Sequence, residues 1–535
     1  MSTVISHDKV TPGGIALKPF YRPEDIAGTD YDKDLADPGK FPFARGIYPE
    51  MYRHTPWVIQ EEVGFDCPED TLKRGELYKQ LGTRHYTMDT FDVYVDCLTQ
   101  LGIDSDSPGV EYQVGKEGTH IDSIHDLERL LATVDLEKTH LGFVAFSFAP
   151  MVYAMLLGVA EKRVVQPAKV VGSINNDPLA GPIGENFLAF PPRGHLRLMI
   201  DMVEYSIEHT PRVQPLTVTT YDIREAGANP VQEIAIGLAQ AMEIIAYAVD
   251  RGLSVDKIAR CLHFHVQAGD YFFEEVAKLR AMRRIWARIL TGHFGATDPA
   301  SARIKYQTHT AGSSLQTKEP LNNVVRAALH TLAAVLGGVQ TIHTCAYDEA
   351  IAIPAEEAAK LAIRTQQIIL EESGVPDVAD PLGGSYYVEW LTNQMEKQAW
   401  NYIETIQNKG GYLTALESSF LLNEVVNSAM KQQEEISSGR RVIVGVNKYV
   451  TAEDEEEIEL FRHNPGTAKM AIERIQSLKE HRDHGLVDRR LGELKKALYE
   501  NKNVIPFMKE AFLAEATNSE VFNVCREVLG EWRPL

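Results

Sequence analysis

The stretch GVQTIHTCAYDEAIAIP, residues 338–354, joins a strand pattern to a helix pattern through a run of polar side chains. Val339, Thr341 and Thr344 favour a strand, whereas residues 348–353 lead into a helix. The polar run therefore lies at the carboxyl end of the strand. In barrel enzymes this end of each strand carries the chemistry, so the stretch predicts a barrel with a site at that end.

Strand-like runs recur along the chain, and helix-like segments separate most of them. The eight runs are residues 85–96, 139–148, 168–175, 216–223, 259–267, 302–312, 338–347 and 384–389. Apolar residues in the intervening segments recur at i, i+3, i+4 and i+7, which is the spacing of one helix face. Because parallel strands need crossover helices, the alternation predicts an α/β protein with a (β/α)8 TIM barrel.

The two ends of the chain differ in composition from the barrel region. Residues 1–45 are rich in Pro, Gly and Asp and show no sustained period, which predicts an extended arm. From residue 451 the sequence becomes acidic and then has the pattern of charged helices. We therefore expect an N-terminal arm over residues 1–45, a barrel domain with a helical appendix over 46–450, and a C-terminal helical extension over 451–535.

The composition limits the class of protein. The 535 residues are 44% hydrophobic, carry a formal net charge of -21 and contain no long Lys/Arg block, so we expect neither nucleic acid nor a membrane as partner. The five cysteines are scattered without Cys-x-x-Cys spacing, which argues against a disulfide framework and a zinc site, and we expect no metal ligands. Without a leader pattern or a run of about 18 apolar residues, the sequence predicts a cytoplasmic protein.

Several segments resemble, in their order along the chain, the adenosylcobalamin-dependent acyl-CoA mutases, the family of methylmalonyl-CoA, isobutyryl-CoA and 2-hydroxyisobutyryl-CoA mutases. The likeness covers most of the chain. Its carriers are YPEMY (48–52), LGIDSDSP (101–108), GSINND (172–177), YDIREAGA (221–228), FFEEVAKLRA (272–281), NNVVRAAL (322–329), QTIHTCAYDEAIAIP (340–354), RTQQIILEESGV (364–375), DPLGGSYYVE (380–389) and VIVGVNKYV (442–450).

The resemblance implies a barrel whose open interior holds the pantetheine chain of coenzyme A. It places Glu225 and Glu349 against the adenosyl ribose of the cofactor, whose vicinal diol suits paired carboxylate acceptors. It places Gly312 where the barrel approaches the corrin ring. The positions that it turns toward the acyl-CoA channel, the thioester or coenzyme A are Tyr48, Met51, Ser173, Gln340 and Thr341.

One family motif is missing from the chain. Cobalamin-binding domains of the family carry Asp-x-His-x-x-Gly, whose histidine becomes the lower ligand of cobalt, and no such motif occurs here. The resemblance therefore implies a large subunit that works beside a separate small cobalamin-binding subunit in a hetero-oligomer such as a heterotetramer. The N-terminal arm is then a candidate clamp for that subunit.

The sequence departs from the methylmalonyl-CoA mutases at positions that contact their substrate. Alignment by flanking motifs places Glu185, Glu62 and Asp222 where those enzymes have Arg, Tyr and His, and Asn175 where they have Gln. Replacing Arg by Glu inverts the local charge, and like charges at close range in a dry pocket cost several kcal/mol. We therefore expect a substrate other than methylmalonyl-CoA, with a hydroxyl, amino or aryl substituent.

An ionised carboxylate cannot donate a hydrogen bond to a thioester oxygen. Asp222 is therefore either protonated in the closed site or replaced as donor by another group, and His263 and His309 are candidates for that group. A histidine on an alternating strand is more often a hydrogen-bonded core residue, which is the interpretation we favour for His265. Glu62 and Glu185 are surface residues in the alternative interpretation, in which the alignment slips.

The resemblance thus implies the large catalytic subunit of an adenosylcobalamin-dependent acyl-CoA carbon-skeleton mutase. Two alternatives remain open at this point. The chain could be a non-catalytic scaffold or regulatory relative of the mutases, or a cobalamin-independent lyase that acts on acyl-CoA.

Overall fold

The computed structural model describes residues 9–85, 87–451 and 458–533, and residues 1–8 of the predicted arm and 452–457 and 534–535 of the predicted extension lie outside it. The chain forms two compact units. Unit 1 comprises residues 1–58 and 219–460, and unit 2 comprises residues 59–218 and 461–535. The chain passes from one unit to the other three times, within β3 (Val58–Gln60), within β10 (Leu216–Thr219) and between residues 460 and 461. Within the described residues, no helix combines the length and the apolar character that crossing a membrane requires.

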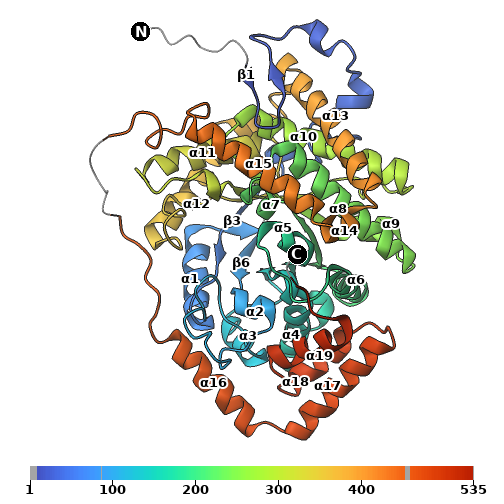
Figure 1. Ribbon diagram of the computed structural model, residues 1–535, viewed down its shortest axis with the longest axis vertical. Coiled ribbons are helices and arrows are strands. Elements are labelled where there is room, and N and C mark those ends of the chain that lie inside the picture. Colours follow the sequence, from blue (N-terminus) through green and yellow to red (C-terminus); the bar gives the residue numbers. More distant parts are fainter. Residues whose placement is uncertain (1–8, 86, 452–457, 534–535) are drawn as a thin grey trace. The chain divides into compact units, whose positions relative to one another are not determined.

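Parallel strands and long helices make up unit 1 (Figure 1). Strand β11 pairs in parallel with β12, and β12 pairs in parallel with β13. The strands are β1 (Lys9–Val10), β2 (Ala16–Leu17), β11 (Leu262–Ala268), β12 (Tyr306–Thr310) and β13 (Thr341–His343). The helices are α7 (Tyr221–Glu225), α8 (Pro230–Asp250), α9 (Val255–Cys261), α10 (Phe272–Arg288), α11 (Asn322–Leu336), α12 (Glu356–Glu371), α13 (Tyr386–Asn408), α14 (Tyr412–Glu417) and α15 (Phe420–Ser437).

Unit 2 repeats the alternation of strand and helix. Strands β6, β7, β8 and β9 pair in parallel in that order. The strands are β4 (Glu62–Val63), β5 (Arg84–His85), β6 (Met88–Tyr94), β7 (Thr139–Val144), β8 (Gly172–Asn175) and β9 (Val213–Gln214). The helices are α1 (Pro68–Leu81), α2 (Cys97–Leu101), α3 (Ile124–Leu130), α4 (Ala149–Lys162), α5 (Gly181–Gly184), α6 (Pro192–His209), α16 (Thr467–His481), α17 (His484–Tyr499), α18 (Ile505–Leu513) and α19 (Asn518–Leu529).

Successive strands that pair in parallel through crossover helices confirm the predicted (β/α)8 fold class. One predicted strand is wrong, because residues 384–389 begin helix α13. Ser385 caps this helix by accepting a hydrogen bond from the Val388 N–H. A strand that the sequence did not predict is β3, whose Val58 N–H donates to the Gln340 carbonyl oxygen at 2.8 Å. Its three residues are too few to show an alternating pattern.

The described part of the predicted N-terminal arm, residues 9–45, lies on other parts of unit 1 (Figure 1). The Tyr21 ring packs on Trp390 of α13, with ring centroids 4.6 Å apart. Asp34 forms an ion pair with Arg288 of α10 at 2.8 Å. The side-chain amide of Asn393 in α13 donates a hydrogen bond to the Thr29 hydroxyl at 2.9 Å. These contacts fix the arm from Tyr21 to Asp34 against α10 and α13.

The C-terminal helices belong to unit 2. Helix α18 packs on α4 (Figure 1). Lys509 of α18 forms an ion pair with Glu161 of α4 at 2.6 Å. The Phe522 ring of α19 stacks on Phe190 with centroids 5.3 Å apart. A Cβ on Gly102 would lie 2.1 Å from that ring, so only glycine permits this approach. Helices α18 and α19 therefore contribute buried side chains to the hydrophobic core of unit 2.

In each unit one face of the sheet is covered by helices and the other is polar. In unit 1, Phe264 packs on Trp286 of α10 at 5.2 Å, so its neighbours His263 and His265 point to the opposite face. In unit 2, Phe91 packs against Gly75 of α1, so Thr90, Asp92 and Tyr94 point to the opposite face. Tightly packed barrels fill this face with Val, Ile and Leu. A polar lining favours a face that receives a ligand.

Candidate active site

Two predicted cofactor-contacting carboxylates border one glycine in unit 1. Glu225 ends α7, Gly312 follows β12, and Glu349 follows β13, so all three stand after the carboxyl ends of strands. A Cβ built on Gly312 would lie 3.4 Å from Glu225 Oε2, 3.4 Å from the Tyr221 hydroxyl and 3.9 Å from Glu349 Cγ. The structure therefore brings Glu225, Gly312 and Glu349 together, and we call the space beside Gly312 the glycine cradle.

Glu225 is held by hydrogen bonds on both carboxylate oxygens. The Ser313 N–H donates to Oε2 at 2.7 Å, the Ser313 hydroxyl donates to Oε1 at 3.2 Å, and the Gln267 amide also donates to Oε1. Burial raises the pKa of Glu225, and the donated hydrogen bonds oppose that rise by stabilising the ionised form. The carboxylate is thus fixed in place with one edge toward the glycine cradle.

A buried charge network supports Gln267 and, through it, Glu225. Lys278 contacts Glu233 at 2.7 Å, Glu275 at 2.5 Å and the Gln267 carbonyl oxygen at 2.6 Å. Glu233 also accepts from the Gln267 N–H at 3.0 Å and pairs with Arg224 at 3.0 Å. Two cations and two carboxylates therefore balance in the interior, and together they fix the end of β11. Sequence reasoning missed Gln267, although its position on the alternating run 259–267 placed it on the same face as His263.

Four aromatic rings form a row on the polar face of unit 1. The centroids of Tyr221 and His265 lie 5.2 Å apart, those of His265 and His309 4.3 Å, and those of His309 and His343 4.4 Å. His263 precedes His265 by two residues on the same face of β11. Within the described residues, no group of three or more His, Cys, Asp or Glu side chains is arranged to hold a metal ion. We call Tyr221, His265, His309 and His343 the histidine row.

Burial determines the protonation of Tyr221 and His265 in this row. Burial lowers the pKa of His265 well below its usual value, and the charges of the neighbouring histidines lower it further. Burial raises the pKa of Tyr221 well above its usual value, and the nearby carboxylates Glu225 and Glu349 add to the rise. His265 is therefore a neutral imidazole and Tyr221 keeps its hydroxyl proton, so both can donate a hydrogen bond.

Asp222 follows Tyr221 on α7, and its charge contributes to the raised pKa of that tyrosine. His263 and His309 lie on β11 and β12, both nearly fully buried. Their proposed roles as thioester-bonding groups stay predictions.

Other predicted ligand contacts in unit 1 take part in packing. The Gln340 side chain accepts from the Tyr306 N–H at 2.9 Å and donates to the Gly338 carbonyl oxygen at 2.9 Å, so it joins strands. Tyr48 packs on a buried cluster that contains Phe43 and Ile47. Met51 lies against Gly46 and within 3.4 Å of a Cβ built on Gly338. Thr341 lies on β13 opposite Gln307 of β12. Their contacts with acyl-CoA stay predictions.

In unit 2, Glu62 lies beside a carboxylate that the sequence analysis missed. Glu62 pairs in register with Asp92 of β6, whose side chain accepts hydrogen bonds from Thr90 and Gln60. Asp92 is 4% exposed, and burial raises its pKa to about 7, with a further contribution from Glu62. A Cβ on Gly142 would lie 1.9 Å from Asp92 Oδ1, so the glycine makes room for this carboxylate. The sequence could have indicated Asp92, because it alternates with Phe91 in the run 85–96 and therefore lies on the face of the strand opposite the helices.

The remaining predicted residues of unit 2 lie on β8 and directly after α5. Ser173 and Asn175 of β8 alternate on one face and pair in register with Gly142 and Val144 of β7. Glu185 follows α5, and burial raises its pKa to about 7, with a contribution from Glu117. In unit 2, two carboxyl groups therefore have raised pKa values. Glu185 is itself a predicted substrate position, and Asp92 lies beside another, Glu62.

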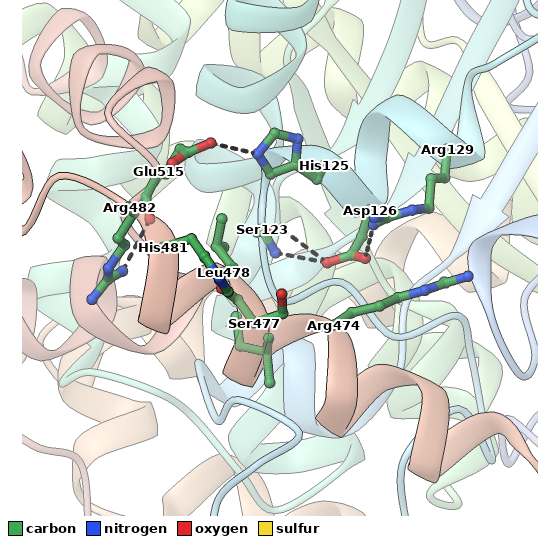
Figure 2. Close-up of a pocket in the computed structure, with 11 residues that line it drawn as sticks. Ser123, His125, Asp126, Arg129, Arg474, Ser477, Leu478, His481, Arg482 and Glu515 are labelled. Carbon is green, nitrogen blue, oxygen red and sulfur yellow. Dashed lines mark hydrogen bonds and ion pairs between the residues drawn. The ribbon is translucent and has the colours of Figure 1, made fainter.

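A separate cavity of about 400 Å³ lies between α3 and α16 of unit 2 (Figure 2). Its charged groups already pair with one another: His125 contacts Glu515 at 2.9 Å, and Arg129 contacts Asp126 at 2.9 Å. Arg474 pairs with Glu69 at 2.8 Å. The sequence did not predict this cavity, and its internal pairing makes it a structural junction of the C-terminal helices.

Comparison with known proteins identifies related enzymes. A family model described as methylmalonyl-CoA mutase matches residues 10–531. The 2-hydroxyisobutanoyl-CoA mutase large subunit of Aquincola tertiaricarbonis is 38% identical over 525 residues, which are 98% of this chain and 92% of the relative. Methylmalonyl-CoA mutase of Cereibacter sphaeroides is 36% identical over 97% of this chain and 72% of its own length. The mitochondrial enzyme of Homo sapiens is 35% identical over 97% of this chain and 68% of its own length.

Proposed function

The chain belongs to the methylmalonyl-CoA mutase family, and we propose that it is the large catalytic subunit of an adenosylcobalamin-dependent acyl-CoA carbon-skeleton mutase. The related enzymes are isomerases that move a group within an acyl-CoA thioester. The observation that carries the proposal is the grouping of Glu225, Gly312 and Glu349 around one cradle.

The residues of the glycine cradle fit an adenosyl group. Glu225 and Glu349 offer carboxylate oxygens to a vicinal diol, and the missing side chain of Gly312 leaves the space between them open. When bound, adenosylcobalamin supplies the radical chemistry by which a substrate hydrogen is removed and returned. Since the chain lacks the cobalt-ligating motif, we propose that a separate small subunit holds the lower face of the cofactor.

The polar side chains of the parallel strands supply what the chain itself contributes to the reaction. In unit 1, hydroxyl and imidazole groups such as Thr341 and His309 can hydrogen-bond the amide and thioester groups of the coenzyme A tail. The protonated Tyr221 hydroxyl lies at the edge of the cradle and can orient the acyl group. His309 is buried, and exclusion of water from such a site protects a reactive intermediate.

The carboxyl groups of unit 2 point to the substrate class. Glu62 with its neighbour Asp92, and separately Glu185, are carboxyl groups whose oxygens can accept hydrogen bonds from a hydroxyl or an ammonium group, and none of them supplies the positive charge that would pair with a malonyl carboxylate. Among hydroxy-, amino- and aryl-substituted acyl-CoA thioesters, this favours the first two. The similarity to the 2-hydroxyisobutanoyl-CoA mutase large subunit supports a hydroxyacyl-CoA. A cytoplasmic location accords with such a metabolic role.

The test is to purify the chain with its small subunit and adenosylcobalamin and to screen methylmalonyl-, hydroxyacyl-, aminoacyl- and aryl-substituted CoA thioesters for rearranged product. Rearrangement of a hydroxyacyl or aminoacyl substrate, with a cob(II)alamin electron paramagnetic resonance signal, would support the proposal. The absence of that signal with every thioester would favour a non-catalytic relative. Activity without cofactor and small subunit would favour a lyase, and a preference for methylmalonyl-CoA would refute the proposed substrate class.

A further inference from the structure

His265 differs from the other buried histidines of unit 1 in its hydrogen bonding. The side chain is 2% exposed, and among the described residues neither ring nitrogen has a hydrogen-bond partner. Buried polar groups in folded proteins nearly always have partners, and an exception marks a strained site, a catalytic role or a ligand that is absent. This exception therefore needs an explanation.

The position of His265 supplies one. The ring stacks nearly parallel to that of Tyr221, at an interplanar angle of 12°, and the Tyr221 hydroxyl borders the glycine cradle. Two residues further along the same face of β11, Gln267 donates to Glu225. His265 is thus one inward position away from the residues proposed to hold the adenosyl group, on the face that the helices leave uncovered.

The neighbouring groups leave a donor role unfilled. When it is ionised, Asp222 can only accept hydrogen bonds, and it stands on α7 directly after Tyr221. The groups that face His265 from the adjoining elements are Tyr221 of α7, His263 on its own strand and His309 of β12. A neutral imidazole has one N–H donor and one acceptor nitrogen, so His265 can give a hydrogen bond without a change of protonation.

We propose that His265 donates a hydrogen bond to the thioester carbonyl oxygen of the acyl-CoA substrate and so fixes the acyl group beside the glycine cradle. The inference rests on the proposed acyl-CoA function and names the residue that meets the substrate within it. It replaces the core role that the strand pattern favoured for this histidine. His309 packs edge-on against the His265 ring at 71° and limits its rotation, which makes His309 a positioning residue for this bond.

The experiment compares two ligands that differ only in the carbonyl group. Acetyl-CoA is too short for a carbon-skeleton rearrangement, and S-ethyl-CoA is the matching thioether without the carbonyl oxygen. Their dissociation constants are measured by isothermal titration calorimetry on the full chain with its small subunit and adenosylcobalamin. The wild type should bind acetyl-CoA about 3- to 10-fold more tightly than S-ethyl-CoA, the ratio expected for one neutral hydrogen bond.

His265→Phe should bring this ratio to about 1, because phenylalanine keeps the ring packing and removes the donor. His265→Gln places an amide donor near the same position and should restore part of the ratio. His293→Phe, an exposed histidine of unit 1 outside the site, is the matched control and should keep the wild-type ratio. Thermal unfolding of each variant checks that the fold is kept.

The outcomes separate this inference from the proposed reaction. A wild-type ratio near 1, or an unchanged ratio in His265→Phe, would overturn the role of His265. Failure of the wild type to bind either ligand would overturn both the role and the acyl-CoA function. A ratio that depends on His265 in a protein that rearranges no thioester would support the contact and refute the mutase reaction.

Discussion

At the scale of single residues, the buried Asp92 makes the folding stability depend on pH. Because burial raises its pKa to about 7, the folded chain holds a proton on Asp92 between about pH 4 and pH 7, where the unfolded chain has lost it. The contribution of this group to stability is therefore full at low pH and is lost as the pH rises through that window. Sequence alone did not single out Asp92, since its significance depends on the register of Glu62 and the space at Gly142.

Asp92→Asn should remove this dependence, because asparagine keeps the shape and does not ionise. We expect the free energy of unfolding of the variant, relative to wild type, to increase by on the order of 3 kcal/mol between pH 5 and pH 8. Urea unfolding at the two pH values measures this. A variant that differs from wild type by the same amount at both pH values would contradict the assignment.

A substitution at Gly312 tests whether the glycine cradle holds the adenosyl group. Gly312→Val places methyl groups where a Cβ alone already lies 3.4 Å from Glu225 and the Tyr221 hydroxyl, so the variant should fill the space proposed for the adenosyl group. Overpacking of this kind costs about 1–3 kcal/mol, so adenosylcobalamin should bind about 10-fold more weakly. Absorbance titration in the presence of the small subunit measures the affinity. Gly292→Val is the control, because a Cβ there meets no atom within 4 Å; equal cofactor affinity in both variants would refute the cradle.

At the scale of secondary structure, the sequence predicted most of the elements and erred where a segment was short. The run 259–267 shows an alternating pattern, and β11 occupies most of it. In residues 384–389 two tyrosines and a valine suggested a strand, yet Val388, Leu391 and Met395 recur at helical spacing and are buried in α13. Tertiary packing of that stripe prevailed over local β propensity.

Substitution of Lys278 in α10 tests whether the buried charge network stabilises the packing of the secondary-structure elements. Lys278→Met removes the ammonium group that contacts Glu233, Glu275 and the Gln267 carbonyl oxygen, and it leaves an excess of buried negative charge. Removing one member of such a network costs about 3–5 kcal/mol, which urea unfolding should detect. Lys360→Met on α12 removes an exposed lysine and should change stability by less than about 0.5 kcal/mol. A similarly small effect for Lys278→Met would show that the network is not needed.

At the scale of the whole molecule, each of the two units is built from two separate segments of the chain. Residues 1–58 and 219–460 build one unit, and residues 59–218 and 461–535 build the other. The alternation of strands and helices gave the fold class, because periodicity is a local property. The assignment of distant segments to a common core depends on long-range contacts such as Phe522 with Phe190. No local pattern encodes that pairing.

The C-terminal segment therefore provides the molecule-scale prediction. Phe522 is fully buried, stacks on Phe190 and occupies the space that Gly102 leaves open, so Phe522→Ala should create a cavity in unit 2. Such a substitution costs about 3–5 kcal/mol. Hydrogen exchange should then increase in α2 and α4 of unit 2, whereas exchange in α10 and α13 of unit 1 should change less. Tyr499→Ala on α17, an exposed position, should leave both patterns unchanged. If Phe522→Ala left the exchange of α2 and α4 as in wild type, the C-terminal helices would be an appendage rather than part of the core.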